Sequence, residues 1–117
     1  METVRLPNVT RPMTYSRPAP SGAFVIATPE RLDAANRGEV RRLALDLIDR
    51  GAIGGASSIT VDLTATRELD ASGLGILVLV QKRAREQGMA TRLRGTAESV
   101  RRLLVLTRLD YLFQLEE

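Results

Sequence analysis

Residues 68–80, ELDASGLGILVLV, place an acid, a hydroxyl and two glycines directly before the most apolar run of the chain. The apolar run alone fits a buried strand or a buried helix, since periodicity cannot separate the two when every residue is apolar. The next residues, 81–87 (QKRAREQ), are strong helix formers, and Gly88 is a typical helix stop. We therefore predict a helix over residues 73–87.

Ser72 is the expected N-cap of this helix, because a serine oxygen accepts hydrogen bonds from the first backbone amides. Its hydroxyl then lies at a strand-to-helix loop, where α/β folds present ligands and partners, and Asp70 adds an acceptor at the same edge. Gly73 and Gly75 each cost the helix about 0.5–1 kcal/mol relative to alanine. They fit either close packing on a sheet or the approach of a second molecule to the hydroxyl. In the second case Gly73→Val is expected to weaken binding more than stability.

The composition excludes much of enzyme chemistry. The 117 residues contain no cysteine and no histidine, so disulfides, thiolates, an imidazole base and histidine metal ligands are excluded. A nucleophilic serine needs a base, and Lys82 lies about three helical turns from Ser72. Asp33, Asp62 and Asp70 could gather at strand tips, but their spacing matches no metal-binding loop. We expect no enzyme activity, no cofactor and no metal site.

Charge and hydropathy limit the classes of partner that we expect. The chain has no apolar stretch of the roughly 18 residues that a membrane span needs and no signal-peptide pattern, so we expect a cytoplasmic protein without membrane insertion. The net charge is +3, but arginines alternate with acids, as at residues 30–31, 49–50 and 85–86. Such mixing is typical of a solvated surface. Aromatic residues make up only 3%, too few for a base-stacking platform, and we expect no nucleic-acid partner.

The chain divides into a lead-in and one domain. Residues 1–20 carry four prolines and little periodicity, and they are interpreted as an irregular lead-in that could supply an edge strand at residues 3–6 or 13–16. Residues 21–117 alternate between strand and helix patterns through short loops, which predicts one α/β domain with a largely parallel sheet. Strands are predicted at residues 22–28, 59–63, 90–94 and 111–115, and further helices at 33–50, between Asp33 as N-cap and Gly51 as stop, and at 97–107 after Thr96 as N-cap.

The motif resembles a known family. Residues 70–77, DASGLGIL, look like the D-[ST]-[ST]-G-[LI]-G-x-[LI] signature of STAS domains, as found in bacterial anti-sigma factor antagonists. Residues 59–63 (ITVDL), 29–33 (PERLD) and 99–113 are similar to the family's strand, turn and tail patterns, so the resemblance spans about residues 22–115. It implies a single STAS-like domain with a mixed, mostly parallel sheet of four to five strands and helices packed on one side.

The resemblance also implies a function. Ser72 would be the phosphorylation site, and the partner would be an anti-sigma factor that is also a serine kinase using ATP and magnesium. Binding of the unmodified chain would free a sigma factor, phosphorylation would release the partner, and a PP2C-type phosphatase would restore the chain. The residues implied in partner binding are Asp33, Asp70, Ala71, Ser72, Gly73, Leu74 and Gly75.

Two residues depart from the family pattern. Ala71 stands where the family carries the first of two hydroxyls, so Ser72 is the single acceptor of this motif. Arg108 replaces the glycine after Thr107, which predicts a different end for the last helix. Two further functions stay open. One is a STAS-type accessory subunit of a membrane transporter ATPase without phosphorylation, which Ala71 favours, and the other is an α/β domain that binds a nucleotide or another small ligand at its strand tips.

Overall fold

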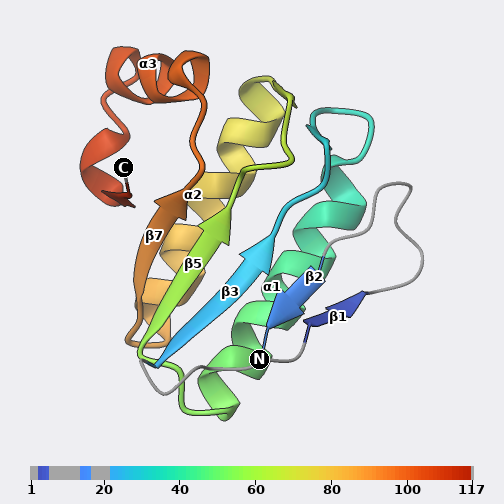
Figure 1. The fold of residues 1–117 in the computed structure, drawn as a ribbon, viewed down its shortest axis with the longest axis vertical. Coiled ribbons are helices and arrows are strands. Elements are labelled where there is room, and N and C mark those ends of the chain that lie inside the picture. Colours follow the sequence, from blue (N-terminus) through green and yellow to red (C-terminus); the bar gives the residue numbers. More distant parts are fainter. Residues whose placement is uncertain (1–2, 6–13, 17–21, 117) are drawn as a thin grey trace.

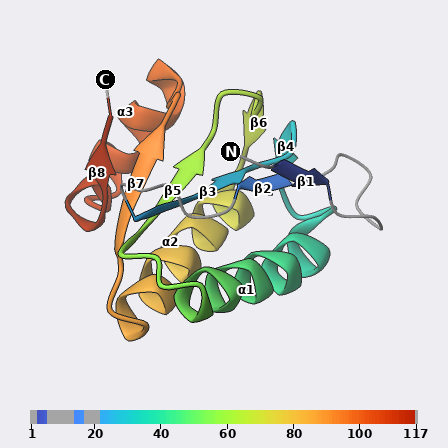
Figure 2. The same cartoon turned by 60° about the horizontal axis from the view of Figure 1, so that its bottom comes forward.

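Four parallel strands form the centre of the sheet. The computed structural model describes residues 3–5, 14–16 and 22–116 of the chain. At one edge of these four, two short strands from the lead-in continue the sheet with antiparallel pairing, so that it has six strands in the described residues against the four to five expected. The mixed, mostly parallel α/β class is confirmed. The strand order across the sheet (Figure 1; β8 is labelled in Figure 2) is β1 (Thr3–Arg5), β2 (Thr14–Ser16), β3 (Ala23–Ala27), β5 (Ser58–Asp62), β7 (Ala90–Arg94) and β8 (Gln114–Leu115).

Two helices cover one face of this sheet. α1 (Arg37–Ile53) and α2 (Ala71–Glu86) run side by side along it (Figure 2), which confirms the predicted packing on one side for these two helices. Each presents an apolar stripe to the sheet, because residues three and four positions apart share a helix face. These stripes and the inner faces of the central strands form one core, whose members include Phe24, Ile26, Val40, Leu47, Ile59, Val61, Leu77, Val80 and Leu93.

α1 begins and ends later than the sequence pattern predicts. Asp33, the expected N-cap, accepts hydrogen bonds from the amides of Ala35 and Asn36 in the turn before the helix, and Asn36 occupies the cap position. Gly51, the expected stop, lies inside the helix. A Cβ at Gly51 would be 3.0 Å from the ring of Phe24. The glycine therefore lets α1 pack closely on β3 instead of ending the helix.

α2 and α3 (Glu98–Leu106) end in the same kind of turn. Gly88 follows α2 with φ of 77°, and Arg108 follows α3 with φ of 59°. In both turns two backbone amides bond to carbonyls of the last helical turn, a Schellman motif whose left-handed residue is usually glycine. Gly88 confirms the predicted stop of α2. The expectation that Arg108 gives α3 a different end is wrong, because the arginine adopts the glycine-type conformation.

The C-terminal part differs from the prediction in two details. The hydroxyl of Thr96, the expected N-cap of α3, is buried without a hydrogen-bond partner among the described residues, and Ala97 occupies the cap position. Residues 111–115 are predicted as one extended piece, but the 3₁₀ turn η1 (Asp110–Leu112) takes the first of them and β8 begins at Gln114. α3 itself lies beyond the carboxyl end of β7 (Figure 1).

Candidate partner-binding site

The starts of α1 and α2 lie next to each other at one end of the fold. β4 (Arg31–Leu32) and β6 (Glu68–Leu69) form a small parallel sheet shortly before the two helices. Their register aligns Leu32 with Leu69, so the segments that leave the two strands begin their helices side by side. Leu32 is fully buried and anchors this small sheet to the core.

Asp70 fixes the start of α2 and ties it to the segment that leads into α1. Its Oδ1 accepts a hydrogen bond from the Gly73 amide at 3.0 Å, and its Oδ2 accepts one from the Ala34 amide at 3.2 Å. Asp70 is therefore the N-cap of α2, and the expectation that Ser72 caps this helix is wrong. The Gly73 amide, assisted by that of Ala34, lowers the pKa of Asp70 below its usual value, although partial desolvation acts in the opposite direction.

The two glycines of this helix start have different neighbours. A Cβ on Gly73 would overlap the carbonyl oxygen of Leu32 and lie 2.8 Å from the Leu32 Cβ, so the missing side chain lets α2 begin directly against β4. A Cβ on Gly75 would meet no atom within 4 Å, and Gly75 is exposed. Close packing therefore accounts for Gly73, and open space exists only at Gly75. Contrary to the expectation that Gly73→Val mainly weakens binding, the structure therefore predicts a large loss of stability for this change.

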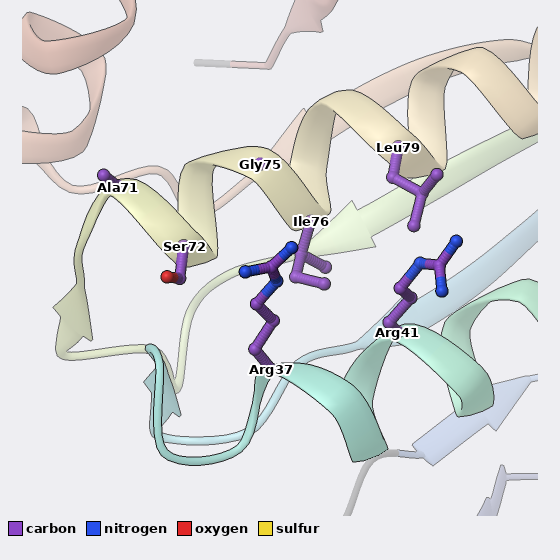
Figure 3. A pocket seen from close by; sticks show the side chains of 7 residues that line it. All are labelled: Arg37, Arg41, Ala71, Ser72, Gly75, Ile76 and Leu79. Atoms are coloured by element: carbon purple, nitrogen blue, oxygen red, sulfur yellow. The ribbon is translucent and has the colours of Figure 1, made fainter.

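Ser72 opens into a groove between the first halves of the two helices. Its hydroxyl points toward this groove (Figure 3), and no hydrogen bond joins the hydroxyl to another described residue. Ser72 is half-buried and its neighbour Ala71 is exposed, so the hydroxyl can be reached from outside. The groove has a volume of about 380 Å³ and is lined by Arg37, Arg41, Ala71, Ser72, Gly75, Ile76 and Leu79.

The groove carries positive charge. The side chains of Arg37 and Arg41 extend into it from α1 toward α2 (Figure 3), and neither forms an ion pair with a described residue. The carboxylates of Asp33 and Asp70 bond to backbone amides, and none of the described residues that line the groove is acidic. An anionic group that enters the groove therefore meets two unpaired guanidinium groups beside an apolar floor.

The acidic residues that the structure describes hold backbone and side-chain groups of the chain itself. In the part of the chain that the structure describes, no group of three or more potential ligands is placed to hold a metal ion, and Asp33, Asp62 and Asp70 do not form one. Asp62 instead accepts hydrogen bonds from the amide and the hydroxyl of Thr64. Over the same residues, no helix has both the length and the apolar character that crossing a bilayer requires.

One protein family matches most of the chain. A model of the STAS domain matches residues 15–117. The chain belongs to the STAS domain family. In this STAS domain the signature stretch, residues 70–77, supplies the N-cap and the first turns of α2, and four of its residues line the groove.

Solved structures with the same fold include anti-sigma factor antagonists. An anti-sigma-factor antagonist (STAS) domain protein from Planctomyces limnophilus matches with a TM-score of 0.73 at 18% identity, over 88% of this chain and 87% of that one. A candidate anti-sigma factor antagonist from Thermotoga maritima gives 0.72 at 22% identity, over 88% and 84%. The phosphorylated form of SpoIIAA, a Bacillus cell fate determinant, gives 0.64 at 15% identity, over 90% and 91%. At these identities the likeness establishes the fold.

The residues predicted to bind a partner fall into three groups. Asp33 and Asp70 use their carboxylates to hold backbone amides at the two helix starts. Gly73 and Leu74 are buried and belong to the packing of α2. Contact with a partner stays a prediction for all seven residues. Those that line the groove of the STAS domain are Ala71, Ser72 and Gly75.

Sequence reasoning missed the α1 side of the groove. The sequence pattern places Arg37 and Arg41 on the polar face of the first helix and gives them no role. Their spacing of four residues puts both side chains on one face of α1, which is the signal that could have found them. Ile76 and Leu79 follow Ser72 at helical spacings of four and seven residues and were equally visible as one face of α2. The pairing of β4 with β6, which brings the two faces together, leaves no motif in the sequence.

Proposed function

We propose that this STAS domain is a phosphorylation-controlled antagonist of an anti-sigma factor that is also a serine kinase. The observation that carries the proposal is the Ser72 hydroxyl, which lies in the first turn of α2, has no partner among the described residues and opens into the groove. Family membership supports it, as does the likeness to anti-sigma factor antagonists, among them SpoIIAA, which matches in both its unphosphorylated and its phosphorylated form. In this proposal the chain is a binding module of the bacterial cytoplasm and not an enzyme.

The unmodified chain binds the kinase through the groove and thereby frees a sigma factor. Gly75 leaves open space one turn beyond the cap, where the backbone of a partner can approach α2 closely. Arg37 and Arg41 offer two cations to an acidic segment, and Ile76 and Leu79 offer apolar surface beside them. Charge complementarity of this kind selects partners and speeds association more than it adds affinity.

A phosphate on Ser72 ends the binding. The group adds about 1.5 to 2 negative charges at a helix N-terminus, a place where an anion is tolerated or mildly stabilising, so the fold is retained. Against a partner that has docked over the bare hydroxyl, the same phosphate is a steric and electrostatic obstacle of about 2–5 kcal/mol. At about 1.4 kcal/mol per tenfold change, binding weakens by roughly thirty-fold to several thousand-fold.

Ser72 is the single acceptor in this scheme. Ala71, which replaces the first hydroxyl of the family motif, is exposed and lines the groove without a group that a kinase can modify. A PP2C-type phosphatase restores the binding form by hydrolysing the phosphoserine. The switch therefore depends on one side chain.

The proposal is tested with the purified chain, a serine-kinase anti-sigma factor from the same organism, and labelled ATP. Label is expected on the wild type and absent from Ser72→Ala. Ser72→Asp is expected to bind the kinase about thirty-fold or more weakly while its melting temperature changes little. Ser99→Asp is the matched control, because Ser99 is exposed and occupies the same second position of α3. Label that persists in Ser72→Ala, or equal binding of wild type and Ser72→Asp, would contradict the proposal.

Ala71 favours a second function, that of an accessory subunit of a membrane transporter ATPase. In that case the same groove packs on the transporter and no kinase acts on Ser72. Purification of the tagged chain from its own cells separates the two functions, because the transporter subunit copurifies with an ATPase and carries no phosphate. The antagonist copurifies with a kinase and carries phosphate on Ser72 in a fraction of its molecules.

A further inference from the structure

The side chain that faces Ser72 across the groove is that of Arg37. It extends from the start of α1 toward the Ser72 hydroxyl (Figure 3), and both residues line the same groove. Arg31, by contrast, is held by Asp33 at 2.9 Å and Glu68 at 3.1 Å. No described residue forms an ion pair with Arg37. Its guanidinium is thus a charged group without an ion-pair partner among the described residues, and it lies in the same groove as the Ser72 hydroxyl.

Helix stability does not account for this arginine. Arg37 is the first residue of α1, where the positive end of the helix dipole disfavours a cation. Arg41, one turn further along, adds a second positive charge to the same groove. A planar guanidinium suits a phosphate because it can donate two parallel hydrogen bonds to neighbouring oxygens. The position therefore fits recognition of an anion that is added later.

We propose that Arg37 binds the phosphate of phosphorylated Ser72 within the same chain. The inference rests on the proposed function, since it presumes that Ser72 Oγ becomes phosphorylated. In that step the oxygen attacks the γ-phosphorus of ATP, the bond from this phosphorus to the bridging oxygen of ADP breaks, and the hydroxyl proton passes to a base of the kinase. The resulting phosphate lies within reach of Arg37, with Arg41 behind it.

The pairing changes the charge of the whole groove. In the unmodified chain, Arg37 and Arg41 give the groove two positive charges that no lining residue among those described balances. A phosphoserine of about 1.5 to 2 negative charges cancels most of them at neutral pH. An acidic partner then loses the cations that attract it, in addition to meeting the bulk of the phosphate. By pairing with the phosphate, Arg37 ceases to be available to an acidic partner, and the groove loses most of its positive charge.

The test measures the second pKa of the phosphate by ³¹P NMR on the isolated chain, with phosphoserine placed at position 72 during translation. The charged groups that face the phosphate are Arg37 and Arg41 of α1 and the Asp70 carboxylate at the cap of α2. An adjacent cation stabilises the dianion, so the pKa in the wild type is expected to lie about half a unit to one unit below that in Arg37→Gln at low salt. The phosphate pKa in Arg37→Lys is expected to fall between those of the wild type and Arg37→Gln.

Arg42→Gln is the matched control. Arg42 is exposed on the same helix and does not line the groove, so its removal changes the net charge equally without touching the site. The phosphate pKa in Arg42→Gln is expected to equal that in the wild type. The ¹⁵N signal of the Arg37 Nε–H group is also expected to shift when Ser72 is phosphorylated. Equal phosphate pKa values in the wild type and Arg37→Gln, or an unmoved Arg37 signal, would overturn the inference.

The measurement needs neither kinase nor partner, so its outcome is separate from that of the proposed function. If Ser72 is never phosphorylated by a kinase, the proposed function fails while the pKa comparison still decides whether Arg37 recognises a phosphate there. If the kinase modifies Ser72 but the pKa values are equal, the switch stands and only the role of Arg37 is refuted.

Discussion

Gly73→Ala and Gly75→Ala are expected to change the stability of the fold in opposite directions. The two glycines are two residues apart in the first turns of α2, and alanine in place of glycine favours a helix by about 0.5–1 kcal/mol at either position. At Gly75 the new methyl group meets no atom within 4 Å, so this gain is retained. At Gly73 the methyl group overlaps the carbonyl oxygen of Leu32, a backbone atom that cannot rotate aside.

The difference between the two variants isolates the steric effect. Because the helix propensity gain is common to both, what remains is the overpacking at Gly73, which typically costs about 1–3 kcal/mol as α2 shifts away from β4. For a domain of this size the difference corresponds to roughly 5–15 °C between the two melting temperatures. Gly75→Ala is expected to be more stable than the wild type, and Gly73→Ala less stable.

Urea denaturation followed by circular dichroism measures both variants, and equal slopes show that the unfolded states are comparable. The same proteins are then tested for binding to the proposed partner, a serine-kinase anti-sigma factor. Gly75→Ala places a methyl group in the groove, so it is expected to bind more weakly although it is more stable. If Gly73→Ala proves as stable as Gly75→Ala, the contact with Leu32 does not set the start of α2 and the reasoning about the site is refuted.

Two further predictions concern the ends of helices. The lowered pKa of Asp70 means that its charge stabilises the fold above the usual carboxyl value near 3.9 and that this contribution is lost as the pH falls through the lower native value. The urea midpoints of wild type and Asp70→Asn are therefore expected to differ at pH 7 and to converge as the pH falls through the lowered pKa of Asp70; a gap that stays constant would contradict this. Arg108→Gly is expected to raise the free energy of unfolding by about 0.5–1 kcal/mol, because glycine adopts φ of 59° without strain. An unchanged urea midpoint would show that the arginine side chain compensates for its backbone.

The body of α2 could be predicted because several local signals agree. The helix formers of residues 81–87 and the stop at Gly88 are matched by a helix that ends at Glu86. The cap could not be fixed in the same way, since Asp70 and Ser72 are both good N-cap residues and lie two positions apart. The choice depends on Ala34, whose amide bonds to the second oxygen of Asp70 across the two helix starts. A contact between segments 36 residues apart leaves no trace in the local pattern.

Gly51 shows the same limit at the other helix. A glycine after an amphipathic stretch is a common helix stop, and the sequence offers no reason to prefer another interpretation. In the fold, the ring of Phe24 occupies the space where a side chain at Gly51 would lie, and α1 continues to Ile53. Glycine is present at this position because α1 packs closely on β3. Whether a glycine at this position ends the helix or permits close packing depends on which strand lies beneath the helix.

The candidate site could be predicted on one side only. The signature stretch leads to Ser72 because its residues are contiguous, so motif and resemblance point to one place. Arg37 and Arg41 belong to a helix more than thirty residues earlier, and only the parallel pairing of β4 with β6 brings that helix start against the other. The chemistry of the groove therefore depends on the starts of both α1 and α2, and only the start of α2 carries a recognisable motif.

The start of α2 separates the contacts that hold the fold from those that a switch can change. A helix advances by about 100° per residue, so Asp70 and Gly73 share one side and Ser72 and Gly75 share another. Asp70 accepts a hydrogen bond from the Gly73 amide, and Gly73 packs on β4. Ser72 and Gly75 face the groove. Because Asp70 already accepts a hydrogen bond from the Gly73 amide, a phosphate on Ser72 would find fewer free amides at the helix terminus, and in the proposed switch Arg37 is its main counter-charge. Phosphorylation as proposed would then change the charge of the outer face and leave the contacts that set the helix in place.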